Sequence, residues 1–386
     1  MAVEDGSQGN PFKTTQDLSA GGLYPELTTP AVVVDMDIVE ANVSRMAHKL
    51  KENGLRHRPH IKSHKSVELA KLQLDAGAIG ITVAKLSEAE VFVRAGVRSV
   101  LVAYPLIGAD KLARFARLHQ EAEMTAVVDS PEGAAGLSQI GISSGKAVPM
   151  LIEIDGGLHR GGRQPGEDAV SFAKQLSGMP GLELKGIMGY FGTIYGRAGE
   201  EELREAVREE VSLLSKIVTD FRNEGLPVEI VSTGSTPAAI MGGELKAAAT
   251  EVRAGNYIFM DASGMGLGIA REEDCALRVI ATVVSLPLPG LATIDAGTKT
   301  LSSDKGHNRP GFGMITGHPD IEITGLNEEH GFLSYDPSMV SLAIGERLEI
   351  IPNHSCVIPN LAHQVYTARK GKTTGTLRID AKGCSY

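Results

Sequence analysis

The sequence has no tryptophan and only 8 Tyr and 9 Phe among its 386 residues. Its three cysteines, Cys275, Cys356 and Cys384, are odd in number and widely spaced, which argues against a disulfide framework and favours a reducing compartment. No apolar run approaches the roughly 20 residues of a membrane span. The first residues also lack the basic and then apolar character of a signal peptide. We therefore expect a cytoplasmic protein without a membrane segment.

An excess of positive charge is also lacking. The 38 Lys and Arg against 47 Asp and Glu give a formal net charge of −9, whereas nucleic acids and anionic membranes are bound by basic surfaces. We therefore expect neither as a partner. Glycine is abundant: 45 of the 386 residues are glycine, about 12%, against a usual share of roughly 7%. Because the chain also carries many β-branched runs, this glycine content favours tight turns around a parallel sheet over disorder.

Short β-branched runs alternate with helical patterns between about residue 29 and residue 260. In the segment 200–223, Leu203, Val207 and Val211 begin an apolar stripe with helical spacing, and Gly225 follows as a stop signal. Repeated βα units predict a parallel sheet. The expected strands are residues 31–35, 55–61, 79–84, 100–104, 125–129, 148–155, 184–190, 228–232 and 251–253.

Two architectures fit this pattern, an open doubly wound sheet and a closed eight-stranded barrel. Nine strands are one too many for a barrel, but the length of the region and the lack of an early Gly-x-Gly-x-x-Gly favour it. Beyond residue 268 the strand-like segments have no long helix between them, which predicts an all-β domain. We predict an α/β protein: a (β/α)8 TIM-type barrel at residues 29–268, then a C-terminal β-domain at 269–386. Residues 1–28 would pack on that domain or on a partner subunit. The expected β-domain strands are residues 277–286, 292–294, 321–324, 347–351 and 364–368.

The stretch Arg58-Pro59-His60-Ile61-Lys62 closes one of the expected strands. A lysine at the carboxyl end of a buried barrel strand would point to the face where barrel active sites lie. Burial would favour its neutral amine, a nucleophile able to form a Schiff base. The alternative interpretation is a basic, solvated surface loop.

Two further turns follow strands, Ser232-Thr233-Gly234-Ser235-Thr236-Pro237 and Arg253-Ala254-Gly255-Asn256-Tyr257. Glycine lets the backbone approach a ligand, and free N–H groups with hydroxyls suit a phosphate. Each could instead be an ordinary βα turn with a helix-capping hydroxyl. Together with a strand-end lysine, two phosphate-type turns suggest a phosphorylated carbonyl cofactor, pyridoxal 5'-phosphate.

With these segments in order, the sequence from about Thr29 to its end resembles the alanine-racemase-like (fold type III) pyridoxal-phosphate enzymes, in their D-serine dehydratase and D-threonine aldolase branch. The family fold implies a barrel that begins at the lysine strand, so strand 31–35 would lie outside it. These enzymes usually work as dimers, so we expect a homodimer. Further marks of the resemblance are Thr29-Pro30, Gly80-Ile81-Thr82-Val83, Glu153-Ile154-Asp155, Glu329-His330-Gly331 and Pro352-Asn353-His354-Ser355-Cys356.

The resemblance implies roles for individual residues. Lys62 matches the Schiff-base lysine, which also removes the α-proton. Arg253 matches an arginine near the pyridine nitrogen, which would stay unprotonated because arginine keeps its own proton. The other expected cofactor contacts are Arg160 at the phenolic oxygen, Tyr190 and Tyr195 near the ring, and the phosphate turns with Gly234, Ser235, Thr236, Gly255, Asn256 and Tyr257.

His354-Ser355-Cys356 places two side chains on one side of an extended segment, as Zn²⁺ binding requires. By spacing alone, such a pair in a cytosolic enzyme is more often accidental. The resemblance implies a divalent-metal site with His354 and Cys356 as ligands, because this branch binds a metal at this position. The metal would polarise the substrate's β-hydroxyl as a Lewis acid. A thiolate ligand favours Zn²⁺ over Mn²⁺ or Mg²⁺, and we expect His363 to be structural.

The branch implies a lyase acting on a small D-3-hydroxy-α-amino acid. D-Threonine aldolases resemble one another in a His-x-Asp metal motif, a Gly-Gly-Gly-Thr-Gly turn and a histidine where this chain has Phe191. This chain instead has Cys356 and the dehydratase-like turn around Ser235. We therefore predict D-serine-type dehydration to a 2-oxo acid and ammonia. Aldol cleavage to glycine and an aldehyde is the main alternative, ahead of a racemase or a non-catalytic pyridoxal-phosphate carrier.

Overall fold

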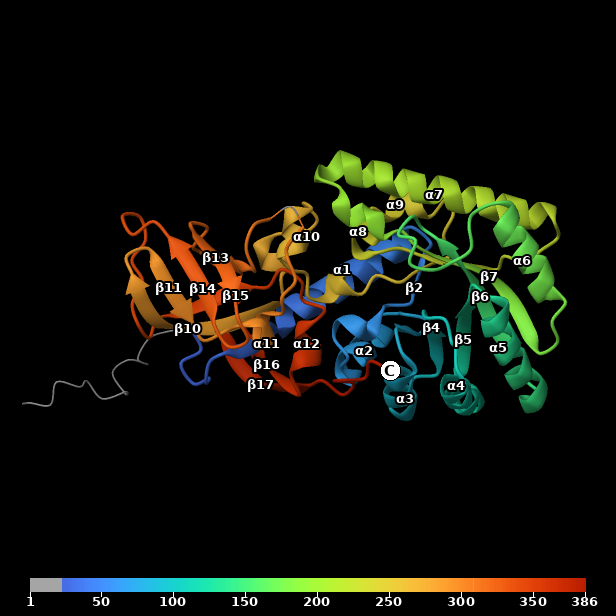
Figure 1. The fold of residues 1–386 in the computed structure, drawn as a ribbon, viewed down its shortest axis with the longest axis horizontal. Coiled ribbons are helices and arrows are strands. Elements are labelled where there is room, and N and C mark those ends of the chain that lie inside the picture. The colour runs from blue at the N-terminus through green and yellow to red at the C-terminus, as the bar shows by residue number, and fades with distance from the viewer. Residues whose placement is uncertain (1–22, 308) are drawn as a thin grey trace, which may run out of the picture.

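The computed structural model describes residues 23–307 and 309–386. Two bodies of different architecture lie side by side in Figure 1: strands covered by helices, and a domain built mostly of strands. The helix-covered body holds an eight-stranded parallel sheet in the order β2-β9-β8-β7-β6-β5-β4-β3. Its strands are β2 (Arg56–His57), β3 (Ile81–Val83), β4 (Ser99–Val102), β5 (Glu123–Val128), β6 (Val148–Asp155), β7 (Leu182–Tyr190), β8 (Ile230–Thr233) and β9 (Glu251–Val252).

The two ends of this sheet meet, which closes it into the predicted barrel. A parallel bridge joins His60 to Thr82, just beyond β2 and within β3. The N–H of Ile79 donates to the carbonyl oxygen of His57 at 2.9 Å. Inside the barrel, a separate apolar cluster fills the space between the strands, as barrel interiors require. It consists of Leu101, Val127, Leu151 and Met188.

Helices cover the outer face of the barrel. The longest, α7 (Gly199–Asn223), lies within one residue of the predicted helix and buries Leu203 and Val207. It stops before Gly225, whose φ of +68° favours glycine. The other helices of this body are α1 (Met36–Glu52), α2 (Val67–Asp75), α3 (Leu86–Arg94), α4 (Ala109–Glu121), α5 (Pro131–Ser144), α6 (Glu167–Ser177), α8 (Thr236–Ile240), α9 (Gly242–Leu245) and α10 (Ala262–Gly266).

The ninth predicted strand, β1 (Ala31–Asp35), belongs to the other sheet. It pairs antiparallel with β10 (Leu277–Leu288) and parallel with β16 (Gln364–Arg369). A strand hydrogen-bonded on both sides and largely buried on both faces reads as a continuous apolar run, which explains its valines. The carboxylate of Asp35 then accepts from the N–H groups of Asp37 and Ile38 (2.9 and 3.2 Å) and caps α1.

The β-domain sheet has the order β13-β14-β11-β10-β1-β16-β17, and β15 pairs with β10 and β12. All five strands expected from the sequence are present. Three others, β12, β14 and β17, were not predicted. The strand β12 has only two residues, and β17 is a largely exposed, polar edge strand without alternation. The remaining elements are β11 (Leu291–Ile294), β12 (Met314–Ile315), β13 (Ile321–Leu326), β14 (Gly331–Tyr335), β15 (Arg347–Ile351), β17 (Lys372–Arg378), α11 (Thr298–Leu301) and α12 (Ile358–Leu361).

Residues 23–28, the described part of the expected N-terminal segment, contact the β-domain. The guanidinium of Arg347 donates to the carbonyl oxygens of Leu23 (3.1 Å), Tyr24 and Leu27 (2.7 Å). The prediction for residues 1–22 lies outside the described residues. No helix in the described ranges is long and apolar enough to cross a membrane.

Candidate active site

A cavity of about 890 Å³ lies at the carboxyl ends of the barrel strands. Each strand contributes a lining residue at or near that end: Lys62, Ala84, Ala103, Asp129, Glu153, Tyr190, Gly234 and Arg253. The β-domain supplies further lining residues, among them Asp304, His307, His354 and Cys356. The cavity therefore lies between the mouth of the barrel and the β-domain, and its size suits a cofactor with a small substrate.

Lys62 lines this cavity, but not from a strand as predicted. The strand β2 ends at His57, because Pro59 has no N–H for the ladder. Lys62 follows in a 3-10 turn, Ile61–Ser63, whose first residue is fully buried. The side chain of Lys62 is exposed toward the cavity, so the predicted burial of its amine by strand packing is wrong.

Residues 381–384 contact Lys65, next to the turn that carries Lys62. Lys65 is buried with a φ of +53°, an unfavourable conformation for a non-glycine residue. Its ammonium donates to the carbonyl oxygen of Cys384 (2.8 Å) and pairs with Glu88 (3.3 Å). The N–H of Ala381 donates to the Lys65 carbonyl (3.0 Å). These contacts hold the strained backbone three residues after Lys62 in place.

The two phosphate-type turns lie next to each other, as the sequence suggested. The N–H of Tyr257 donates to the hydroxyl of Thr236 (3.1 Å) and joins the turns. Gly234 has a φ of +88°, a conformation that favours glycine. The hydroxyl of Ser235 accepts from the N–H of Ala238 (3.3 Å) and so caps α8, which confirms the helix-capping interpretation for this side chain.

A buried carboxylate lies behind the first of these turns. Glu210 of α7 is 2% exposed and accepts a hydrogen bond from the hydroxyl of Thr233 (2.6 Å). The backbone N–H of Gly234 also donates to this carboxylate. Burial raises the pKa of Glu210 to about 7. This contact leaves no signal in the sequence, because Glu210 belongs to a different element, α7.

Arg253 lines the cavity and is fixed by hydrogen bonds. Its guanidinium donates to the hydroxyl of Ser232 (2.9 Å) and to the carbonyl oxygen of Gly189 (2.7 Å). Ser232 in turn donates to Glu251 (2.8 Å), which pairs with Arg58 (3.1 Å). Burial lowers the pKa of Arg253, and this network holds the guanidinium in one orientation.

The predicted aromatic and arginine contacts divide into two groups. Arg160 lies over the ring of Tyr190 at 5.2 Å, and both line the cavity. Tyr195 also lines it, stacks against His307 (5.4 Å between ring centroids) and has a pKa raised by burial. The side chain of Tyr257 is instead buried outside the cavity lining, and its hydroxyl accepts from Gln73 (2.9 Å). The ring of Tyr257 packs in the core, and the expected contact of this residue with the cofactor phosphate stays a prediction.

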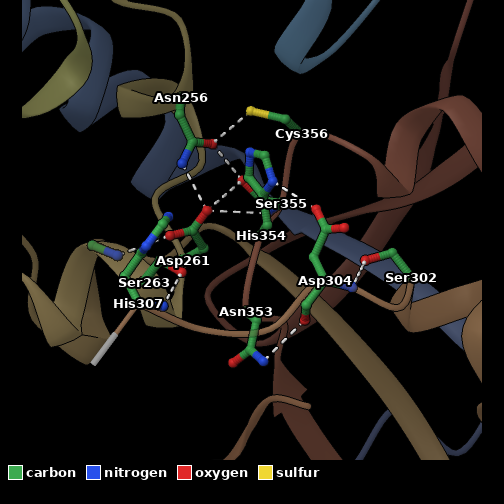
Figure 2. Close-up of polar contacts among 11 residues, drawn as sticks. Asn256, Asp261, Ser263, Ser302, Asp304, His307, Asn353, His354, Ser355 and Cys356 are labelled. Carbon is green, nitrogen blue, oxygen red and sulfur yellow. Dashed lines mark hydrogen bonds and ion pairs between the residues drawn. The ribbon is translucent and has the colours of Figure 1, made fainter. Parts of the chain in front are cut away.

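His354 and Cys356 both line the cavity, and Figure 2 shows their neighbours. Nδ1 of His354 lies 2.8 Å from a carboxylate oxygen of Asp304. The thiol of Cys356 donates to the side-chain oxygen of Asn256 (3.3 Å), and the Asn256 amide donates to Asp261 (2.7 Å). Negative charge on the sulfur of Cys356, present when that thiol has lost its proton, is the main cause that raises the pKa of His354 to about 10. In the described part of the chain, no group of three or more His, Cys, Asp or Glu side chains could hold a metal ion.

Sequence reasoning missed several lining residues. His60 and Glu153 lie inside motifs already noted, so these two polar residues could have been predicted to line the cavity. Asp304, Lys305 and His307 come from a β-domain loop with no recognisable motif. Phe191 does not line this cavity but a smaller one. His363 does not line the active-site cavity either.

Comparison with known families covers most of the chain. Residues 34–263 match the alanine racemase N-terminal domain, and residues 276–368 match a serine dehydratase domain. The chain belongs to the alanine-racemase-like family. Within this family of fold-type III pyridoxal-phosphate enzymes, it belongs to the D-serine dehydratase and D-threonine aldolase branch, whose members are lyases.

Three curated relatives show the extent of the similarity. D-threo-3-hydroxyaspartate dehydratase of Delftia sp. (strain HT23) is 34% identical over 348 residues, which cover 86% of this chain and 91% of the relative. D-threonine aldolase of Arthrobacter sp is 30% identical over 372 residues, 95% of each protein. D-serine dehydratase of Dictyostelium discoideum is 28% identical over 360 residues, 86% of this chain and 91% of the relative.

Solved structures are similar over nearly the whole chain. D-threonine aldolase from Filomicrobium marinum has a TM-score of 0.86 and 29% identity, covering 94% of this chain and 97% of that chain. D-threo-3-hydroxyaspartate dehydratase from Delftia sp. HT23 has a TM-score of 0.83 and 32% identity, covering 94% and 98%. A variant of the latter enzyme with one cysteine replaced by alanine is described as metal-free, and another variant replaces the histidine two residues earlier.

Proposed function

We propose that this protein is a pyridoxal-phosphate- and divalent-metal-dependent lyase that dehydrates and deaminates a D-3-hydroxy-α-amino acid. The observation that carries the proposal is that Lys62 and the pair His354 and Cys356 line one cavity. An amine nucleophile and a soft, two-residue metal site are therefore available to the same small molecule. The net products would be a 2-oxo acid and ammonia.

The cavity residues fit pyridoxal phosphate by their chemistry. Lys62 supplies a primary amine for covalent attachment, and the turns around Ser235 and Asn256 supply hydroxyl, amide and backbone donors for a phosphate. Arg253 would lie by the pyridine nitrogen and Arg160 by the phenolic oxygen, with Tyr190 and Tyr195 near the ring. Gly234, Thr236 and Gly255 would complete the phosphate turns. When bound, the cofactor supplies an electron sink for charge that develops at the substrate's α-carbon.

His354 and Cys356 would hold the metal, and Zn²⁺ is the ion that an imidazole and a thiolate favour, ahead of Mn²⁺ or Mg²⁺. Two solved variants of a D-threo-3-hydroxyaspartate dehydratase replace a histidine and the cysteine two residues later, and the structure of the cysteine variant is a metal-free form. This parallel supports the assignment. A bound metal would supply Lewis-acid chemistry for a hydroxyl group.

In dehydration, the amine of Lys62 takes the proton from the substrate's α-carbon, and the bond between the β-carbon and its hydroxyl oxygen breaks. The hydroxide gains a proton and leaves as water, and one water is taken up again when the dehydrated product is hydrolysed to the 2-oxo acid and ammonia. Arg253 cannot give up its proton to a ring nitrogen, and its fixed guanidinium would limit how much charge the ring accepts. That limit favours rapid departure of the β-hydroxyl once the α-proton has been removed. His354 and Cys356 would place a metal in the same cavity as that hydroxyl.

Aldol cleavage is the second candidate, and one observation favours it. His307 lines the cavity beside Tyr195 and is a base of suitable type for the proton of a β-hydroxyl. If that proton were removed first, the bond between the α- and β-carbons would break and yield glycine and an aldehyde. Aldolases are also among the relatives of this chain.

We further propose the assembly of the protein. The chain would divide into a pyridoxal-phosphate-binding barrel at residues 29–268 and a β-domain with the metal ligands at 269–386. Residues 1–28 would pack on the β-domain or a partner subunit of a homodimer. We expect the protein to act in the cytoplasm on small D-amino acids.

Product analysis tests the reaction. The purified enzyme, loaded with pyridoxal phosphate and Zn²⁺, is incubated with D-serine, D-threonine or D-threo-3-hydroxyaspartate, with L-serine as a stereochemical control. We expect 2-oxo acid and ammonia in equal amounts from at least one D-substrate. Glycine and an aldehyde without 2-oxo acid would contradict dehydration and establish cleavage.

A further inference from the structure

We propose that Asp304 is a positioning residue, which orients His354 so that one ring nitrogen faces a bound divalent metal. This inference rests on the proposed metal role of His354 and Cys356. Asp304 and His354 are fifty residues apart in the sequence and come from different segments of the β-domain. Figure 2 shows the Asp304 carboxylate directed at the His354 ring.

The hydrogen bond between the two residues fixes the state of the imidazole. An ionised carboxylate can only accept, so the bond of 2.8 Å to Nδ1 of His354 places a proton on that nitrogen. When a metal displaces the second proton of the ring, the lone pair lies on Nε2, the nitrogen left for that metal. A carboxylate partner of this kind orients metal-binding histidines and makes them better ligands.

Asp304 is itself held toward His354. Its N–H donates to the hydroxyl of Ser302 (3.2 Å), and its carbonyl oxygen accepts from the amide of Asn353 (3.1 Å). Asn353 is buried, directly precedes His354, and also donates to the carbonyl oxygen of Gly311 (2.9 Å). The backbone that carries Asp304 is therefore tied to the backbone that carries His354.

Asp304 is placed as a partner of His354 and not as a third ligand. Together with His354 and Cys356 it does not form a three-residue metal site in the described residues. Its carboxylate engages Nδ1, so a metal on Nε2 would lie on the other side of the ring. Cys356 has its own partner, the oxygen of Asn256 at 3.3 Å.

The test measures metal affinity. Full-length protein loaded with pyridoxal phosphate is titrated with Zn²⁺ alone, in competition with a chromophoric chelator, for the wild type and for Asp304→Ala and Asp304→Asn. We expect the Kd for Zn²⁺ to rise about 10- to 100-fold in Asp304→Ala. The rise should be smaller in Asp304→Asn, because an amide oxygen can still accept from Nδ1. Asp320→Asn removes the same charge from an exposed site of the β-domain and should leave the Kd unchanged.

Three further results decide the matter. If the Kd of Asp304→Ala equals that of Asp320→Asn, the inference is wrong. If Asp304→Ala loses Zn²⁺ binding as completely as Cys356→Ala does, Asp304 is a ligand, and the inference is again wrong. If His354→Ala and Cys356→Ala bind Zn²⁺ like the wild type, the proposed metal site itself fails. Should Asp304→Ala not fold, Asp304→Asn decides alone: an unchanged Kd contradicts the inference and a several-fold rise supports it.

Discussion

The carboxylate of Glu210 accepts a hydrogen bond from the hydroxyl of Thr233 at 2.6 Å, directly before the turn at Gly234. The two residues come from α7 and β8, and the contact places an ionisable group behind the proposed phosphate turn. Burial raises the pKa of Glu210 from 4.5 to about 7. The folded protein therefore holds this proton more tightly than the unfolded chain does.

This difference predicts a pH-dependent stability. The contribution of Glu210 to the free energy of unfolding should fall as the pH rises from the unfolded pKa of 4.5 through about 7 and stay low above it. The shift corresponds to about 3 kcal/mol. Glu210→Gln has no carboxyl group to titrate at this position. The free energy of unfolding of this variant, taken relative to the wild type, should therefore be larger at pH 8 than at pH 5. Urea unfolding at both pH values measures the effect.

The neighbouring Glu209 provides the control for that experiment. It is exposed and pairs with Arg197 at 2.8 Å, and exposed ion pairs contribute little to stability. Glu209→Gln should therefore keep the pH dependence of the wild type. An identical pH dependence in Glu210→Gln would show that Glu210 is ionised in the fold as it is in the unfolded chain.

Gly255→Ala should displace the turn that carries Lys62. A Cβ at this position would lie 2.4 Å from the carbonyl oxygen of His60 and 2.5 Å from the hydroxyl of Ser63. Such overpacking costs about 1–3 kcal/mol, and we expect weaker binding of pyridoxal phosphate, measured by fluorescence titration. In Gly243→Ala the added Cβ would meet only an ordinary contact at 3.8 Å. Equal affinities in the two variants would contradict this expectation.

Lys62→Ala should abolish covalent attachment of the cofactor, because the variant has no amine at that position of the cavity. The visible absorbance band of the purified, cofactor-loaded protein should disappear on gel filtration. Lys111 also lines the cavity, with its ammonium near the carbonyl oxygen of Ile107 (3.2 Å). Lys111→Ala should keep the absorbance band. If Lys111→Ala lost the band and Lys62→Ala kept it, Lys111 would be the lysine that binds the cofactor.

Removal of the metal should lower the activity. Lewis-acid stabilisation of several kcal/mol corresponds to a loss of about 100-fold or more in kcat/KM. We expect this loss on chelation of the wild type and in Cys356→Ala, with no further loss when Cys356→Ala is chelated. Cys384 holds Lys65 through its backbone carbonyl, so Cys384→Ala should retain activity and metal content. Full activity of the chelated wild type would refute the metal role.

The local features of this protein could be predicted from its sequence. The apolar runs of the barrel strands and the stripe of α7 follow from burial patterns with periods set by each element, which neighbouring residues encode. The same is true of Gly234 in a turn with positive φ. The extended segment expected for His354 and Cys356 is not found, because residues 355–357 form a turn that leads into α12. The edge strand β17 was missed because it is largely exposed and therefore carries no alternation.

The resemblance to a family supplied the roles of Lys62 and of the pair His354 and Cys356, and the residue pattern by itself left each of them open. What only the tertiary structure decided are contacts between segments far apart in the chain. Glu210 behind Gly234, Ala381 and Cys384 against Lys65, and Asp304 against His354 leave no periodic signal. The structure also turned the ring of Tyr257 away from the cavity. The physical reason is that period and turn chemistry act over a few residues, whereas a partner twenty or more residues away is set by how separate elements pack.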